Sequence, residues 1–138
     1  MTTQETFDQC VAHLRRQKVP AIEGAKCLYR TTDGKKCAAG YFIPDAEYDP
    51  VMEGMSLCFC YGNHSDPDDW GFADNQLGQL ACWKEHSVRL MHALQLAHDN
   101  AARDAKAGCK PFLLSLEENL ANIAKNHVLV YVPPSEAA

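Results

Sequence analysis

A chain of 138 residues is the size of one domain, and its 46% of apolar residues are sufficient to fill one hydrophobic core. The mean hydropathy is −0.32 and no apolar run approaches about 18 residues, which excludes a transmembrane helix. The first residues are polar and acidic, without the basic and apolar segments of a signal peptide. We therefore expect residues 1–138 to form a single domain that stays in the cytosol.

The net charge of −5 is unevenly distributed along the chain. Residues 37–83 contain no lysine or arginine and carry a charge of −8, whereas the remainder has 13 basic against 10 acidic residues. An acidic segment repels phosphate groups, so we expect no direct binding of nucleic acid there. It is either a solvated acidic loop or a surface for a basic partner. Its acidic residues are Asp45, Glu47, Asp49, Glu53, Asp66, Asp68, Asp69 and Asp74.

Residues 3–18 are predicted to form a helix, because apolar residues recur at helical spacing from Phe7 to Leu14. Thr3 is a suitable N-cap, and the helix should end before Pro20, since the residue preceding a proline avoids helical backbone angles. Residues 25–30 and 37–42 then favour the two strands of a β-hairpin with a two-residue turn at Asp33-Gly34.

The central residues are the most difficult to assign. Pro44 is well placed to begin a helical turn over residues 45–48. Residues 55–61 suit either a third strand or a helical turn, and residues 62–71 are rich in turn formers and predict a loop.

The second half of the chain has helical periodicity over residues 74–106, which Ser87 would divide in two if it caps a separate helix. Gly108 is expected to end this segment, and residues 112–126 predict a further helix. Residues 128–132 favour a strand. The predicted class is α+β: an N-terminal helix, a β-hairpin, helices, and a C-terminal strand that completes a small antiparallel sheet.

Seven cysteines are ordinary small core residues in a reducing cytosol. In the predicted hairpin Arg30 faces Cys37 and Cys27 faces Gly40. The two thiols would then be roughly 10 Å apart, beyond the reach of a disulfide. We expect no structural disulfides, and we expect Arg30 to form an ion pair with Asp45 or Glu47.

The order of these residues resembles a family of small proteins of tailed phages and prophages that has no assigned activity. The resemblance covers residues 3–55 and 90–134, whereas an acidic central insertion at about 56–84 lies outside it. Residues 133–138 are expected to form a frayed tail. It implies a phage-derived protein working in the cytoplasm of a bacterial host. The matching positions are Cys27, Tyr29, Arg30, Gly34, Cys37, Ala38, Gly40, Ile43, Pro44, Asp45, Tyr48, Glu53, Gly54, Leu94, Gln95, His98, Asp99, Ala124, Lys125 and His127.

One hypothesis is a structural zinc site, because thiolates and imidazoles are the ligands that Zn²⁺ prefers. The spacing Cys-x-Cys is unusual for such sites, and there are five candidates for four positions. The alternative is that the thiols are reduced core residues and the imidazoles are exposed. The candidates are Cys58, Cys60, His64, Cys82 and His86.

A second hypothesis is a small cysteine-dependent enzyme. Cys37 follows two lysines, which would lower its pKa, and His98 could act as a base. Adjacent residues of a helix point about 100° apart, so Asp99 is not expected to orient His98 directly. The alternative is that His98 is a packing or capping residue, and no phosphate-binding loop, serine-hydrolase or dinucleotide motif is present.

The hypothesis we favour is a non-catalytic protein that binds a host protein, for takeover or to counter a defence system, with zinc and enzyme activity as alternatives. Aromatic residues surrounded by charge are typical of binding hot spots. A nucleic-acid mimic is a variant of this hypothesis, although eight acidic residues are few for it. The predicted contact residues are Asp66, Asp68, Asp69, Trp70, Phe72 and Asp74.

Overall fold

A computed structural model describes residues 1–134 of the chain. Within them, four α-helices and two antiparallel two-stranded sheets give a mixed α+β fold. The helices are α1 (Thr3–Gln17), α2 (Ala38–Tyr41), α3 (Val88–Ala107) and α4 (Phe112–His127). The strands are β1 (Ile22–Glu23), β2 (Lys26–Cys27), β3 (Cys58–Cys60) and β4 (Trp70–Phe72). Short 3-10 helices cover Pro50–Met52, Pro67–Asp69 and Ala81–Glu85.

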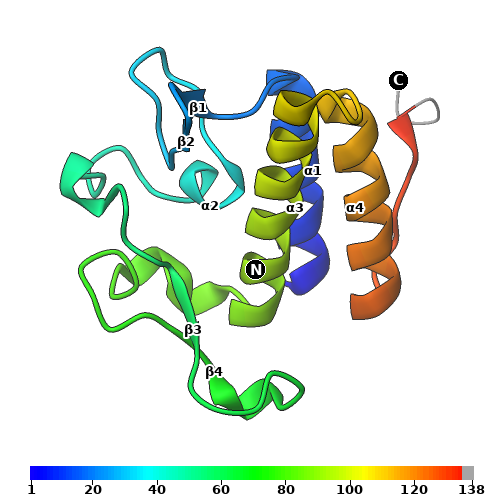
Figure 1. Cartoon of the computed structure of the whole chain (residues 1–138). Coiled ribbons are helices and arrows are strands. Elements are labelled where there is room, and N and C mark those ends of the chain that lie inside the picture. The colour runs from blue at the N-terminus through cyan, green and yellow to red at the C-terminus, as the bar shows by residue number, and fades with distance from the viewer. Residues whose placement is uncertain (135–138) are drawn as a thin grey trace.

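The molecule divides into two parts, which Figure 1 shows side by side. The first is the helical layer, formed by α1, α3 and α4. The second is the loop region, residues 19–87, which carries α2 and all four strands. Each part has its own cluster of buried apolar side chains, with Leu14, Leu94, Leu116 and Leu120 fully buried in the helical layer. Trp83 and Met52 are buried in the loop region.

The three long helices agree with the sequence, apart from details at their ends. α1 is capped by Thr2, whose side chain accepts a hydrogen bond from the Glu5 N–H, rather than by the predicted Thr3. α3 begins after Ser87, whose side chain accepts a hydrogen bond from the Leu90 N–H, and it ends at Gly108 in the left-handed conformation. The predicted division at Ser87 is therefore confirmed.

The prediction of a helix from residue 74 is wrong for residues 74–80, which form turns. The reason lies at Gly78, where the chain folds back onto itself. A Cβ atom at this position would lie 1.9 Å from the Ala73 carbonyl oxygen, so the turn requires glycine. The buried Trp83 indole then donates a hydrogen bond of 2.8 Å to the Leu77 carbonyl and fixes the reversed chain.

The predicted hairpin of residues 25–30 and 37–42 is also wrong. Residues 38–41 form helix α2, and the strand partner of β2 is β1, with Ile22 opposite Cys27. Arg30 faces Lys36 in an isolated bridge instead of facing Cys37. Tertiary packing decides the outcome, because a Cβ atom at Gly40 would lie 1.8 Å from the Tyr29 carbonyl oxygen. The small residues of α2 leave room for the Tyr29 backbone to pack against them.

The C-terminal segment 128–132 forms no strand, contrary to the prediction. Val128 adopts a left-handed conformation with φ 56°, and the chain turns back alongside α1. The Gln4 side chain there accepts a hydrogen bond from the Val130 N–H at 2.8 Å and donates one to the Val130 carbonyl at 3.0 Å. A glutamine side chain thus replaces the expected strand partner. Of the predicted frayed tail at 133–138, residues 135–138 lie outside the described residues.

Residues 55–61, for which a strand and a helical turn were both open, contain strand β3. The acidic insertion consequently forms a second hairpin, in which β3 pairs with β4 and Phe59 lies opposite Gly71. Figure 1 shows this hairpin extending away from α1 and α4 at the bottom of the view. It places most of the predicted contact residues in one projecting segment.

Candidate functional site

The acidic residues of the β3–β4 hairpin are partly used to order its tip. Asp66 and Asp68 are exposed, whereas Asp69 is half-buried. Asp69 accepts a hydrogen bond from the Asn63 N–H, and Asp66 accepts one from the Asp68 N–H. Asp74, beyond β4, is exposed and accepts a hydrogen bond from the Gln79 side chain. The negative charges therefore sit on a defined loop.

The two predicted aromatic contact residues are half-buried. The Trp70 indole donates a hydrogen bond of 3.0 Å to the His64 carbonyl, and its ring packs 4.7 Å from the His92 ring on α3. Phe72 stacks on the buried Trp83 at 5.7 Å and joins the apolar cluster of the loop region. Both aromatic rings thus contribute to anchoring the hairpin on the rest of the molecule.

The aromatic residues that the hairpin does expose are Phe59 and Tyr61, which the sequence reasoning missed. Their side chains are 52% and 62% exposed, and their ring centroids lie 5.0 Å apart. Residues two apart on a strand share a face, so the alternation Cys58-Phe59-Cys60-Tyr61 was a signal that could have identified them. Large exposed aromatic pairs mark candidate binding sites.

The five residues proposed as zinc ligands do not gather in the described part of the chain. No three of them bring their ligand atoms within 4.8 Å of one another. Cys58 points its sulfur at the Val88 carbonyl, and the His86 Nδ1 lies 2.9 Å from the Thr6 hydroxyl. Burial raises the pKa of Cys58 to about 12 and that of Cys82 to about 11, so both are neutral thiols at neutral pH.

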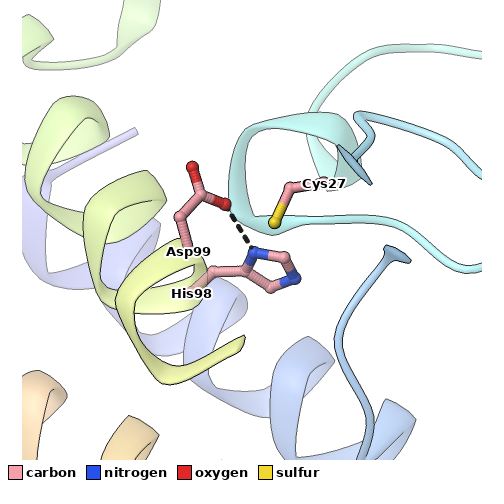
Figure 2. A group of neighbouring side chains, drawn as sticks. All are labelled: Cys27, His98 and Asp99. Carbon is pink, nitrogen blue, oxygen red and sulfur yellow. Dashed lines mark hydrogen bonds and ion pairs between the residues drawn. The ribbon is translucent and has the colours of Figure 1, made fainter. Parts of the chain in front are cut away.

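The structure instead brings together Cys27, His98 and Asp99, as Figure 2 shows, with ligand atoms within 4.8 Å of one another. His98 is fully buried, and its Nδ1 lies 2.9 Å from an oxygen of Asp99. The expectation that Asp99 does not orient His98 is therefore wrong. The carboxylate bends back toward the neighbouring imidazole, whereas the expectation considered only where each side chain leaves the helix.

Both nitrogens of His98 are occupied by the protein itself. The Ala21 N–H donates a hydrogen bond of 3.0 Å to Nε2, so Nε2 carries no proton and Nδ1–H donates to Asp99. A metal ion on Nδ1 would require a proton on Nε2, directly facing the Ala21 N–H. The arrangement fits a hydrogen-bonded imidazole and does not fit a metal ligand.

Asp99 also connects α3 to α2 through Gln95. The Gln95 side-chain amide donates a hydrogen bond of 3.0 Å to Asp99, and its oxygen accepts one of 2.9 Å from the Ala39 N–H. Two side chains of one helix, Gln95 and His98, therefore hold two backbone N–H groups of the loop region. Such a buried network has a positioning role when all its members are bonded.

The thiols near this network are poor nucleophiles. Cys37, the predicted nucleophile, is fully buried, and its sulfur accepts a hydrogen bond from the Gly40 N–H at the start of α2. Burial raises its pKa to about 12. Cys27 is exposed, but partial covering of its sulfur and the charge of Asp99 raise its pKa to about 11. A thiolate is the reactive species, so neither residue suits covalent catalysis at neutral pH.

A second polar network holds the backbone of the chain segment 27–30. The Glu53 carboxylate accepts hydrogen bonds from the N–H groups of Tyr29 and Arg30, and from the Tyr48 hydroxyl at 2.7 Å. Arg30 packs over the Tyr48 ring and forms an ion pair of 2.8 Å with Asp45, as predicted. The motif residues Tyr29, Arg30, Asp45, Tyr48 and Glu53 therefore stabilise the loop region.

Comparisons with known proteins do not indicate a function, so the function has to be argued from the geometry of the structure. No family model matches the chain, and no curated protein or solved structure is significantly similar to it. In the described residues, no helix is both long enough and apolar enough to cross a membrane.

Proposed function

We propose that this chain is a non-catalytic accessory protein of a phage or prophage, which binds a protein in the cytoplasm of its bacterial host. The β3–β4 hairpin is the proposed contact, and a basic surface on the host protein is the proposed partner. The observation that carries this proposal is the exposure of Phe59 and Tyr61 on a hairpin without lysine or arginine. The phage origin rests on the resemblance in sequence described above.

Physical arguments support the hairpin as the contact. Aromatic side chains supply large contact area at a small entropic cost, and they dominate binding energies at interfaces. Asp66 and Asp68 are exposed on the same hairpin and would attract a basic partner, which raises the rate of encounter more than the final affinity. Because Asp69 and Trp70 order the tip through hydrogen bonds, the hairpin would lose little entropy on binding.

A pull-down from bacterial lysate tests the proposal, with mass spectrometry of the captured proteins. We expect the wild-type protein to retain one stoichiometric partner, and the double substitution Phe59→Ser with Tyr61→Ser to lose it without lowering the melting temperature. The matched control is Leu114→Ser, because Leu114 is 52% exposed on α4, far from the hairpin in the sequence. A partner captured equally by the double variant would contradict the hairpin as the contact.

The predicted acidic contacts are tested in a second step with the purified partner. Substituting Asp66 and Asp68 together with Asn should slow association and weaken its dependence on salt. Trp70 and Phe72 are less suitable for this test, since each packs against other residues of the protein. An unchanged association rate would argue against charge steering.

A further inference from the structure

A cavity of about 360 Å³ lies between the β1–β2 hairpin and α3. Its volume falls in the range of about 300–1,000 Å³ that is typical of small-molecule sites. One wall comes from the hairpin and the other from two turns of a single helix. Its lining includes Ile22, Ala25, Cys27, Asp99, Arg103 and Lys106.

One end of the cavity offers a carboxylate oxygen. The hydrogen bonds from Gln95 and His98 both go to Oδ1 of Asp99. Across residues 1–134, no nitrogen or hydroxyl donor forms a hydrogen bond with Oδ2, although the Cys27 thiol also lies beside this carboxylate and interacts with it. Asp99 retains part of its surface in solvent, with 29% of its side chain exposed. Its second oxygen is therefore available to a donor on a ligand.

The other end of the cavity carries two cations without ion-pair partners. Arg103 is four residues from Asp99, a spacing that favours an ion pair on a helix, and Lys106 lies one turn further on. Within the described chain, neither residue takes part in a salt bridge, because the Asp99 carboxylate is turned toward His98. Both positive charges act on the Cys27 thiol across the cavity, where they oppose the increase in its pKa.

We propose that this cavity binds a small zwitterion of the free amino-acid class. The ammonium group of the ligand would donate to Asp99, and its carboxylate would meet Arg103 and Lys106. Ile22, Ala25 and Ala102 supply an apolar wall for a short aliphatic side chain. This site does not depend on the protein contact that is proposed above for the β3–β4 hairpin.

The charge pattern favours this ligand class over its simpler relatives. A plain anion would gain from Arg103 and Lys106 but would be repelled by Asp99, whose carboxylate lines the same cavity. A plain cation would gain from Asp99 but would be repelled by Arg103 and Lys106. A molecule that carries both charges close together satisfies both ends of the cavity at once, and both ends lie on the same helix, which holds them at a fixed separation.

The proposal is tested by titrating the ¹⁵N-labelled full chain with L-valine and following the backbone amide resonances. We expect saturable shifts at the amides of Ala25, Cys27 and Arg103. Isovalerate lacks the ammonium group and isobutylamine lacks the carboxylate, and each should bind at least about tenfold more weakly than valine. Equal binding of isovalerate and valine, or no saturable shift at about 10 mM ligand, would overturn the proposal.

A double substitution separates binding from folding. Arg103 and Lys106 are exposed, so replacing both with Gln should leave the melting temperature unchanged and abolish the valine shifts. The matched control replaces Lys84 and Lys125 with Gln. Both are exposed lysines outside the cavity, so this variant should bind valine as the wild type does. Valine binding that survives the Arg103 and Lys106 substitutions would also overturn the proposal.

Discussion

In the helical layer, order comes from apolar side chains on regular helices, whereas the loop region is organised by single polar side chains that bond to backbone groups. Most of the buried residues along α1, α3 and α4 are apolar, and the exceptions are Thr6, His13, His98 and Ser115. The elements of the loop region have five residues or fewer and supply few backbone hydrogen bonds of their own. Glu53, Gln95 and His98 hold its backbone instead.

Because of this difference, substitutions should destabilise the two parts in different ways. An apolar core is cooperative, so a cavity in it weakens the whole domain. A loop that depends on one carboxylate can open locally when that carboxylate is changed, while the helices remain folded. Substitutions in the two parts should therefore differ in the extent of the molecule that they affect, as well as in free energy.

The largest effect is expected for Leu120→Ala in α4. Leu120 is fully buried in the helical layer, and its truncation leaves a cavity that the long helices cannot close. We expect the free energy of unfolding to fall by about 2–5 kcal/mol, measured by urea denaturation. Leu114→Ala on the exposed face of the same helix should change it by less than about 0.5 kcal/mol. Equal effects of the two substitutions would contradict the assigned core.

A smaller and more local effect is expected for Glu53→Gln. The change removes the charge that accepts hydrogen bonds from Tyr29, Arg30 and Tyr48, and it should cost about 2 kcal/mol. Hydrogen exchange should become faster at the Tyr29 and Arg30 amides, with α4 unaffected.

The control for this prediction is Glu118→Gln, since Glu118 forms a solvent-exposed ion pair with Lys110. It should alter neither the stability nor the exchange pattern by a measurable amount. Uniform acceleration of exchange across α4 as well as the loop region, after Glu53→Gln, would show that the two parts unfold as a single unit.

The smallest expected effect is a pH dependence at His86, which lies where the two parts meet. Its imidazole contacts Thr6 of α1 and packs beside the rings of Phe42 and Trp83. Burial lowers its pKa below the ordinary value of 6.5. The unfolded chain then binds more protons than the folded chain, so stability should fall as the pH drops below about 6.5 and level off below the folded-state pKa.

His86→Gln should reduce this pH dependence, as measured by melting temperatures between about pH 7 and pH 5. Burial also lowers the pKa of His13, His92 and His127, so part of the slope should remain in this variant. A slope unaffected by His86→Gln would assign the pH dependence to the other histidines.

Local signals explain which elements the sequence predicted correctly. The apolar stripe of α1, the Ser87 cap and Gly108 each act over a few residues, so their consequences can be derived without the rest of the chain. The ion pair of Arg30 was predicted with either Asp45 or Glu47, and the structure forms it with Asp45. The apolar stripe and the caps each involve residues of a single helix and its ends.

Long-range packing explains what the sequence did not reveal. Residues 38–41 became a helix because Gly40 lies beneath the Tyr29 backbone, a contact that no local pattern encodes. His98 was recognised as a candidate base, whereas its pairing with Asp99 was not expected, and Cys27 joins the two through the path of the β1–β2 hairpin. Phe59 and Tyr61 were missed because residues 55–61 did not decide between a strand and a helical turn.

The hydrogen bonds between Gln4 and Val130 have a consequence for synthesis on the ribosome. α1 is made first, yet its bonding partners include Glu117, Val130 and Val132, near the other end of the chain. At about 5–20 residues per second, more than 100 further residues take roughly 5 to 20 seconds to emerge. The side chains of Gln4 and Arg15 remain without these partners during that interval, so the contact between the C-terminal segment and α1 is among the last to form.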